Sequence, residues 1–190
     1  MRHGQTIFNV QHKIQGWCDS PLTELGRGQA EIAGRWFTDN GIVFDHACSS
    51  TSERACDTLE IVTGGSMPYT REKGLKEWNF GAYEGKDECL NPPRPYGDFF
   101  KTWGGEGEQE FKARISSALT EIMERPGWNT VLAVSHGAAC ANFARAWQER
   151  GSVRYTPGIK NCSIFKYEYE DGLFLLTEII QHDFSSLEKK

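Results

Sequence analysis

The chain contains 190 residues, of which 38% are hydrophobic and 12% aromatic, a length and composition that suit one soluble domain with a substantial core. Its formal charge of -5 argues against general nucleic-acid binding, which usually requires a basic surface. No apolar run approaches the ~20 residues that a membrane-spanning helix needs, so we expect a single domain over residues 1–190 that binds neither nucleic acid nor membranes.

The cysteine pattern and the first residues of the chain bear on the cell compartment. The six cysteines contain no C-x-x-C pair, and none has a histidine at zinc-finger spacing. The chain begins without the charged and apolar segments of a secretory signal peptide. Reduced thiols in the cytoplasm are therefore the favoured interpretation, and a disulfide is the less favoured one.

Turn residues and apolar periodicity predict the elements of the first half of the chain. Residues 7–22 contain Asn, Gly, Asp, Ser and Pro without a clear period, which favours a loop. Thr23 is a suitable N-cap for a helix that extends to about Asp39. A short strand is expected over 44–48, followed by a helix over 52–63.

The segment 86–107 differs in composition from the rest of the chain. It holds three prolines and four glycines, which predicts a long irregular connection. Long irregular segments in compact domains are often lids or binding loops, so we expect this one to be a lid. A helix follows over 108–124, with Phe111, Ile115 and Ile122 on one apolar face.

Strands and helices alternate in the C-terminal part. A continuous apolar run at 130–134 predicts a buried parallel strand, and residues 137–148 predict a helix. Strands at 165–169 and 173–180 should form an antiparallel hairpin at the edge of the sheet, joined by the Asp171-Gly172 turn. We therefore expect an α/β domain, a three-layer α/β/α sandwich with a mostly parallel central sheet and helices on both faces.

The stretch Arg2-His3-Gly4-Gln5-Thr6 contains the residue types that a phosphohistidine enzyme needs. A neutral imidazole attacks phosphorus and forms a covalent intermediate, which divides one difficult transfer into two easier steps. The planar guanidinium group of arginine binds two phosphate oxygens at once. Glycine lets the backbone approach the ligand closely. The motif is short, so it indicates a phosphohistidine site only if other segments of the chain supply the remaining residues of such a site.

Three further segments supply complementary parts of such a site. They are Ser49 to Ala55, Leu75 to Gly85, and Val134 to Ala139. Together with the opening motif, in this order and at these separations, they resemble the histidine phosphatase superfamily, which includes cofactor-dependent phosphoglycerate mutases and many small phosphatases. The resemblance spans Arg2 to about Ile164 and implies the phosphoglycerate mutase-like fold.

The resemblance implies a role for each of five catalytic residues. His3 would be the nucleophile, and Arg2 and Arg54 would bind the phosphoryl oxygens. His136 lies where a strand meets a helix, the place where sites in open α/β sheets collect, and would donate a hydrogen bond to a phosphate oxygen. Glu77 would be the general acid that protonates the leaving oxygen.

The resemblance also suggests residues around this centre. Glu84 is the alternative general acid, although we expect it to be structural. Asn9, Gln15, Gly16 and Gly137 are the expected substrate-binding residues. No set of side chains has the spacing of metal ligands, so we expect neither a metal nor an organic cofactor for the favoured reaction.

The chain departs from the superfamily pattern in two places. The usual glycine-glutamate-serine signature of the later segment is Gly105-Glu106-Gly107 here, so we assign no role to Glu106. In the superfamily a central strand lies directly before the arginine-histidine motif, whereas only Met1 precedes Arg2. We expect the first central strand to be missing and the chain to start at an internal methionine.

The second half-reaction separates the activities that the motifs allow. Attack of water on the phosphohistidine gives a phosphatase, whereas return to a second hydroxyl of a retained substrate gives a mutase. The mutases of the superfamily carry a longer insertion with extra arginines, while residues 86–105 offer only Lys86, Arg94 and Lys101 as cations. We therefore favour a phosphomonoester phosphatase that acts on a small phosphorylated metabolite.

Three alternatives stay open at the level of the sequence. Phosphoglycerate mutase is the second function, and only then would 2,3-bisphosphoglycerate be a cofactor. A non-catalytic phospho-ligand-binding module is less favoured, because the nucleophile and its partners are all present. A homodimer could form if the apolar strand 173–180 pairs edge to edge, although a covered edge is equally compatible with the pattern.

Overall fold

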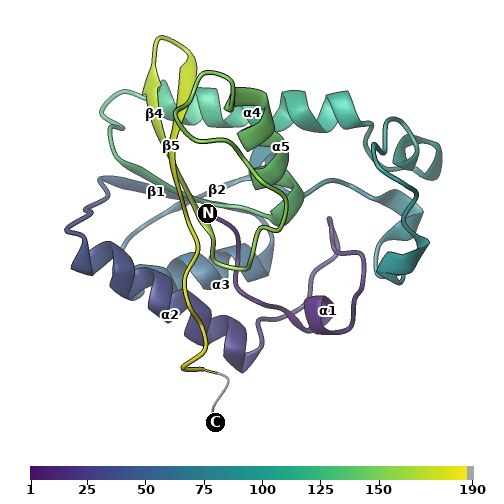
Figure 1. The fold of residues 1–190 in the computed structure, drawn as a ribbon, viewed down its shortest axis with the longest axis horizontal. Helices are drawn as coiled ribbons and strands as arrows, with labels where there is room; N and C mark the ends of the chain where they lie inside the picture. Colours follow the sequence, from purple (N-terminus) through teal and green to yellow (C-terminus); the bar gives the residue numbers. More distant parts are fainter. Residues whose placement is uncertain (188–190) are drawn as a thin grey trace.

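The computed structural model describes residues 1–187. Its α-helices are α1 (Ile7–Val10), α2 (Glu24–Asp39), α3 (Glu53–Val62), α4 (Glu108–Met123) and α5 (Gly137–Trp147) (Figure 1). Its strands are β1 (His46–Ser50), β2 (Thr70–Glu72), β3 (Val131–Val134), β4 (Ile164–Glu170) and β5 (Leu173–Ile180). Short 3-10 helices occur in the connections at Lys73–Leu75, Gly81–Tyr83, Glu88–Leu90 and Phe100–Trp103.

The elements form a layered α/β structure. Strands β2, β1 and β3 make a parallel sheet in that order, and β4 and β5 make an antiparallel hairpin. Helices α2 and α3 cover one face of the parallel sheet, and α4 and α5 lie on the other side (Figure 1). The α/β class with helices on both faces and the antiparallel C-terminal hairpin are therefore confirmed. The hairpin forms a separate two-stranded sheet, so its predicted place at the edge of the parallel sheet is wrong.

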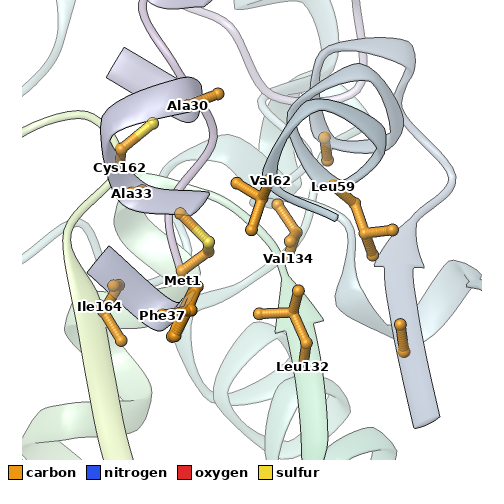
Figure 2. Packing of buried hydrophobic residues seen from close by; sticks show 12 residues of the cluster. Met1, Ala30, Ala33, Phe37, Leu59, Val62, Leu132, Val134, Cys162 and Ile164 are labelled. Carbon is orange, nitrogen blue, oxygen red and sulfur yellow. The ribbon is translucent and has the colours of Figure 1, made fainter. Parts of the chain in front are cut away.

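Helix α2 shows how local sequence directs an element towards the core. Thr23 Oγ1 accepts a hydrogen bond from Gly26 N at 3.0 Å, which caps the helix as predicted. Ala30, Ala33 and Phe37 recur at intervals of three and four residues and are buried in the core shared with α3 and β3 (Figure 2). The cap and the apolar stripe together set the start and the buried face of the helix.

Three local features differ from the sequence prediction. Ile7–Val10, inside the predicted loop, form one helical turn because Thr6 and Asn9 cap each other reciprocally. Strand β1 begins two residues later than predicted, since the Asp45 carboxylate accepts a hydrogen bond from Thr130 N in the turn before β3. Strand β2 lies outside the prediction, because three largely exposed residues show no period.

The irregular segment 86–107 is anchored to the body of the protein. Phe100 is fully buried, and its ring lies 4.8 Å from that of Phe80 and 6.2 Å from that of Trp78. Gly105 N donates to the carbonyl oxygen of Phe100, which closes the last turn of the segment. The irregular conformation is confirmed, and a lid role stays a prediction.

The sheet is interrupted beside the first residues of the chain. Within residues 1–187, β3 and β4 do not pair with each other. Residues 1–3 lie between their ends, because Arg2 forms a parallel bridge with Ser135 and donates its backbone N–H to the carbonyl oxygen of Ser163. His3 N donates to the carbonyl oxygen of Ser135. The gap is where the sequence predicts that a central strand is missing, and it leaves His3 at the carboxyl end of β3.

We expect Gly26→Ala to destabilise the fold, because a Cβ at Gly26 would lie 2.0 Å from the carbonyl oxygen of Gln5. Overpacking of this kind costs about 1–3 kcal/mol. Gly28→Ala in the same helix is the matched control, since its Cβ would first meet the flexible side chain of Leu187 at 3.0 Å. Thermal unfolding should give a lower Tm for Gly26→Ala only. Equal Tm values for the two variants would contradict this explanation.

Candidate active site

His3 is buried at the carboxyl end of β3, and the backbone sets its tautomer. Nδ1 lies 2.7 Å from the carbonyl oxygen of Gly4, and a carbonyl only accepts, so Nδ1 carries the hydrogen. Burial, followed by the charges of Arg54 and Arg2, lowers the pKa of His3 well below its usual value. The ring is therefore neutral at neutral pH, and Nε2 carries the lone pair, towards which the Nε–H of Arg54 is directed at 3.3 Å.

Arg54 is fully buried near the start of α3 and forms hydrogen bonds through all three guanidinium nitrogens. Nε approaches His3 Nε2 at 3.3 Å, and Nη2 donates to the carbonyl oxygen of Gly16 at 2.8 Å. Nη1 donates to the carbonyl oxygen of Cys18 at 2.9 Å and to the Asp19 carboxylate at 2.8 Å. A buried charge needs such compensation. The arrangement holds the loop at 16–19 beside His3.

Arg2 brings a second positive charge to the site. Its Nη1 donates to the carbonyl oxygen of Ile159 at 2.6 Å, and its Nε is buried without a partner among the described residues. Burial lowers the pKa of Arg2, although arginine stays protonated in proteins. A Cβ at Gly137 would lie 3.5 Å from Arg2 Nε, so this cation adjoins the first turn of α5. A guanidinium group beside a helix N-terminus favours an anion.

His136, the N-cap of α5, faces His3. The ring centroids of His3 and His136 are 5.3 Å apart in an edge-to-face arrangement. Nε2 of His136 lies 2.7 Å from Ser50 Oγ, whereas Nδ1 is buried and unpartnered within residues 1–187. Burial, followed by the charge of Arg54, lowers the pKa of His136 well below its usual value. If the Ser50 hydroxyl donates to Nε2, the hydrogen lies on Nδ1 and can be donated to an anion.

Glu77 is buried against the N-terminus of α5. Its Oε1 accepts hydrogen bonds from Trp78 N at 2.9 Å and from Ala139 N at 3.0 Å, and Oε2 accepts one from Ala138 N at 2.7 Å. Burial raises the pKa of Glu77, and the amide hydrogen bonds and nearby arginines oppose this shift only in part. A raised pKa suits a carboxyl group that has to deliver a proton.

Glu84 organises the loop on which Gly16 lies. Its carboxylate accepts hydrogen bonds from the backbone N–H groups of Gly16, Trp17, Cys18 and Phe80, at distances of 2.8–3.1 Å. The side chain is therefore committed to four amide donors. This agrees with the structural role expected for Glu84 and favours Glu77 as the acid.

Asn9 is linked to the backbone of His3 through Asn161, a residue that the motifs do not include. The side-chain amide of Asn161 donates to the Asn9 Oδ1 atom and to the carbonyl oxygen of His3, each at 3.2 Å. Asn161 belongs to the irregular stretch between α5 and β4, which has neither a period nor a motif. No sequence signal marks it, because its relevance comes from the fold alone.

The other predicted substrate-binding residues have clear structural roles. Gln15 accepts a hydrogen bond from the Thr6 hydroxyl at 2.8 Å and donates to the Ser20 hydroxyl at 3.0 Å. Gly16 is buried, and a Cβ there would lie 2.0 Å from the carbonyl oxygen of Trp78. Gly137 begins α5 beside Arg2. Gln15 and Gly16 thus build the wall of the site, and substrate contact by any of the three stays a prediction.

An ion pair between Arg114 and Glu106, to which no motif assigns a role, supports Glu77. Arg114 Nε lies 2.6 Å from Glu106 Oε1, and Arg114 Nη2 donates to the carbonyl oxygen of Glu77 at 3.0 Å. Glu106 Oε2 also accepts a hydrogen bond from Asn79 N at 2.9 Å. The Gly105-Glu106-Gly107 segment therefore clamps the loop that carries Glu77, although its last residue departs from the family signature.

The described part of the chain contains no metal-ligand cluster, no disulfide and no membrane-spanning helix. No group of three or more His, Cys, Asp or Glu side chains within residues 1–187 is placed to hold a metal ion. All six cysteines are free thiols. No described helix is both long and apolar enough to cross a membrane. A metal-independent reaction and a cytoplasmic location stay predictions.

The chain matches the model of the histidine phosphatase superfamily (branch 1) over residues 1–181. The probable phosphoglycerate mutase GpmB of Citrobacter koseri is 32% identical over an alignment of 191 positions, which covers 92% of this chain and 86% of the relative. A solved phosphoglycerate mutase from Bacillus anthracis is 28% identical, with a TM-score of 0.80 over 99% of this chain and 93% of that chain. The phosphoserine phosphatase of Entamoeba histolytica, solved with 3-phosphoglyceric acid, is 26% identical, with a TM-score of 0.77 over 96% and 95%.

The fold and these relatives define an enzyme of the class that removes or transfers phosphoryl groups. The chain belongs to the histidine phosphatase superfamily, branch 1, which confirms the resemblance drawn from the four motifs. The relatives carry the names of both mutases and phosphatases, so the family leaves the particular reaction open.

We expect Ser50→Ala to lower kcat by about fivefold, because the loss of one hydrogen bond, worth ~1 kcal/mol, releases the tautomer and orientation of His136. Ser52→Ala is the matched control, since its hydroxyl contacts Ser50 Oγ at 3.4 Å and not the histidine. Steady-state rates on an aryl phosphate, with Tm values for both variants, would test this. Equal rates for the two variants at similar Tm would show that Ser50 does not position His136.

Proposed function

We propose that the protein hydrolyses phosphomonoesters of a small metabolite through a phosphohistidine intermediate on His3. The observation that carries the proposal is the buried, neutral imidazole whose Nδ1 is held by Gly4 and whose Nε2 faces Arg54. Such a ring is a ready nucleophile, because it need not lose a proton before it attacks. Arg2, Arg54 and His136 supply the positive charge and donors that phosphoryl transfer requires.

In the first step His3 Nε2 attacks phosphorus, and a phosphorus–nitrogen bond forms as the bond to the leaving oxygen breaks. Glu77 donates its proton to that oxygen, so the alcohol leaves neutral. In the second step water attacks phosphorus and Glu77 accepts its proton. The phosphorus–nitrogen bond breaks, inorganic phosphate leaves and His3 is restored. The cycle uses only groups of the chain, so the proposal includes no metal and no organic cofactor.

The cations of the segment 86–105 favour hydrolysis over mutase action. Lys101 pairs with Glu110 at 2.5 Å, and the guanidinium group of Arg94 lies 5.6 Å from the ring centroid of Tyr96. Lys86 lies over the ring of Tyr83. A mutase has to retain a doubly anionic intermediate, for which cations engaged with neighbouring side chains are poorly suited. The names of the relatives support phosphoglycerate mutase, with 2,3-bisphosphoglycerate as cofactor, as the second candidate.

We expect His3→Ala to abolish the hydrolysis of 4-nitrophenyl phosphate, and we expect the wild type to retain its activity in the presence of a chelator. His12→Ala is the control, because the side chain of that histidine is exposed and its ring lies 3.8 Å from the carboxylate of Glu88. Isomerisation of 3-phosphoglycerate should be measured in parallel. Isomerisation that exceeds hydrolysis would overturn the phosphatase proposal in favour of the mutase, and activity retained in His3→Ala would exclude the phosphohistidine.

The pH profile of kcat/KM should extend to lower pH than a histidine with its ordinary pKa of about 6.5 would allow. The acidic limb should lie well below pH 6.5, because the pKa of His3 is lowered and the ring stays neutral there. The alkaline limb should appear as pH rises through the raised pKa of Glu77, where the acid loses its proton.

Glu77→Gln should remove this alkaline limb and slow an alkyl phosphate by about 10²–10⁴-fold. The loss on 4-nitrophenyl phosphate should be smaller, since that leaving group needs little protonation. Glu84→Gln is the comparison variant. If Glu84→Gln rather than Glu77→Gln removed the alkaline limb, the assignment of the acid would be reversed.

A further inference from the structure

Two lysine side chains converge on the ring of Trp17. The Nζ atom of Lys76 lies 4.5 Å from the centroid of this ring, and the Nζ atom of Lys73 lies 5.5 Å from it. An aromatic face attracts a cation, but it carries no net charge that could neutralise one. Among the ion pairs within residues 1–187, none includes either of these ammonium groups. Two positive charges therefore share one ring without a carboxylate partner.

The Trp17 ring is held between two segments that build the candidate active site. Its indole Nε1 donates a hydrogen bond to the carbonyl oxygen of Glu77 at 3.0 Å, and its backbone N donates to the Glu84 carboxylate at 2.8 Å. The carbonyl oxygen of the preceding residue, Gly16, accepts a hydrogen bond from Arg54 at 2.8 Å. The ring is half-buried. These bonds fix the aromatic platform beside the site.

The backbone of Lys76 is fixed in the same way. Lys76 directly precedes Glu77, and its backbone N donates to the carbonyl oxygen of Lys73 at 3.2 Å. Its carbonyl oxygen accepts a hydrogen bond from Arg114 Nη1 at 2.9 Å. The side chain is half-buried, so it has less conformational freedom to lose when a ligand binds than a fully exposed lysine has. Lys76 therefore presents its ammonium group from a defined position.

The charge of Lys76 acts on the same space as Arg54 and His136. Burial, followed by the charge of Arg54, lowers the pKa of Lys76, and the charge of Lys76 is among those that lower the pKa of His136. The carboxylates of Asp19 and Glu84 oppose the shift at Lys76. Both are committed to other donors, since Asp19 pairs with Arg54 and Glu84 accepts four backbone N–H groups. A bound anion would offset the repulsion between the lysine and the arginine.

The position of Lys76 relates it to the leaving group rather than to the phosphoryl group. In the proposed reaction Glu77 donates its proton to the leaving oxygen, so the alcohol lies beside the segment that carries Glu77. Lys76 is the adjacent residue of that segment, and Trp17 is bonded to the carbonyl oxygen of Glu77. The phosphoryl oxygens already have donors in the two arginines and in His136. A charged group on the alcohol would therefore meet Lys76.

We propose that Lys76, with Lys73 beside it on the Trp17 ring, binds a second anionic group of the substrate. This inference rests on the proposed phosphatase function and specifies its substrate class, a phosphomonoester whose leaving alcohol carries a carboxylate or a second phosphate. An ammonium group pairs with either anion as a point charge. Hydrolysis requires this contact only until the alcohol leaves, so it does not demand the retained intermediate of a mutase.

Non-hydrolysable phosphonates test this assignment without turnover. 4-Phosphonobutyrate carries a carboxylate, propane-1,3-bisphosphonate carries a second phosphonate in its place, and 4-hydroxybutylphosphonate carries a neutral hydroxyl group at the same chain length. Isothermal titration calorimetry should show at least about fivefold tighter binding of one or both anionic compounds than of the hydroxyl compound. This preference should weaken as the salt concentration rises, because the lysines are partly exposed to solvent.

Three variants separate the charge of Lys76 from other effects. Lys76→Met removes the charge and keeps the length of the side chain, so the preference should fall below about twofold. Lys76→Arg should retain the preference. Lys86→Met is the matched control and should also retain it, since Lys86 Nζ lies 4.7 Å from the centroid of a different ring, that of Tyr83.

Three results would overturn the proposal. The first is a wild type that binds the three compounds equally or not at all, and the second is an undiminished preference in Lys76→Met. The third is an equal loss of affinity for all three compounds in that variant, which would place Lys76 on the phosphoryl group. Hydrolysis of 4-nitrophenyl phosphate, measured in parallel, tests the proposed function separately. A preference that depends on Lys76 without such hydrolysis would support the anion site and reject the phosphatase reaction.

Discussion

The candidate site depends on the burial of one positive charge, the guanidinium group of Arg54. A fully buried cation has to be compensated, so the positions of Gly16, Cys18 and Asp19 around it are constrained by hydrogen bonds. The same charge adds to burial in lowering the pKa of both His3 and His136. One ionic group thus sets the path of the adjoining loop and helps to keep two histidines neutral, which nucleophilic attack requires.

The two sides of the site differ in how they are held. Glu77 is fixed by two amides of α5 and by Arg114, which reaches the carbonyl oxygen of Glu77 from α4. His3 is instead held by the backbone of residues 1–3, which lies between the end of β3 and the start of β4 and borders a cavity of about 500 Å³ between these strands. The side of the site that carries Glu77 is therefore supported by the helices α4 and α5. The backbone of the His3 side is held on both flanks, by Ser135 after β3 and by Ser163 before β4.

Elements with local causes were predictable from the sequence. The Thr23 cap and the apolar stripe placed α2, the alternation of residues placed β4 and β5, and the hairpin turn follows from Asp171 and Gly172, both at positive φ. Strand β2 and the helical turn α1 were missed, because one has no period and the other rests on a reciprocal pair of side chains. Boundaries elsewhere moved by one or two residues, as helix and strand ends usually do.

The sequence by itself determined the family and the residue types of the candidate site, because those residue types occur in four recognisable motifs. Only the tertiary structure decided which side chains hold them in place. Ser50 meets His136 across 86 positions of sequence, and Asn161 meets His3 across 158. The cavity between β3 and β4 was likewise not predictable from the sequence. Hydrogen-bond partners and packing gaps are set by which distant segments the fold brings together, and no local pattern encodes that.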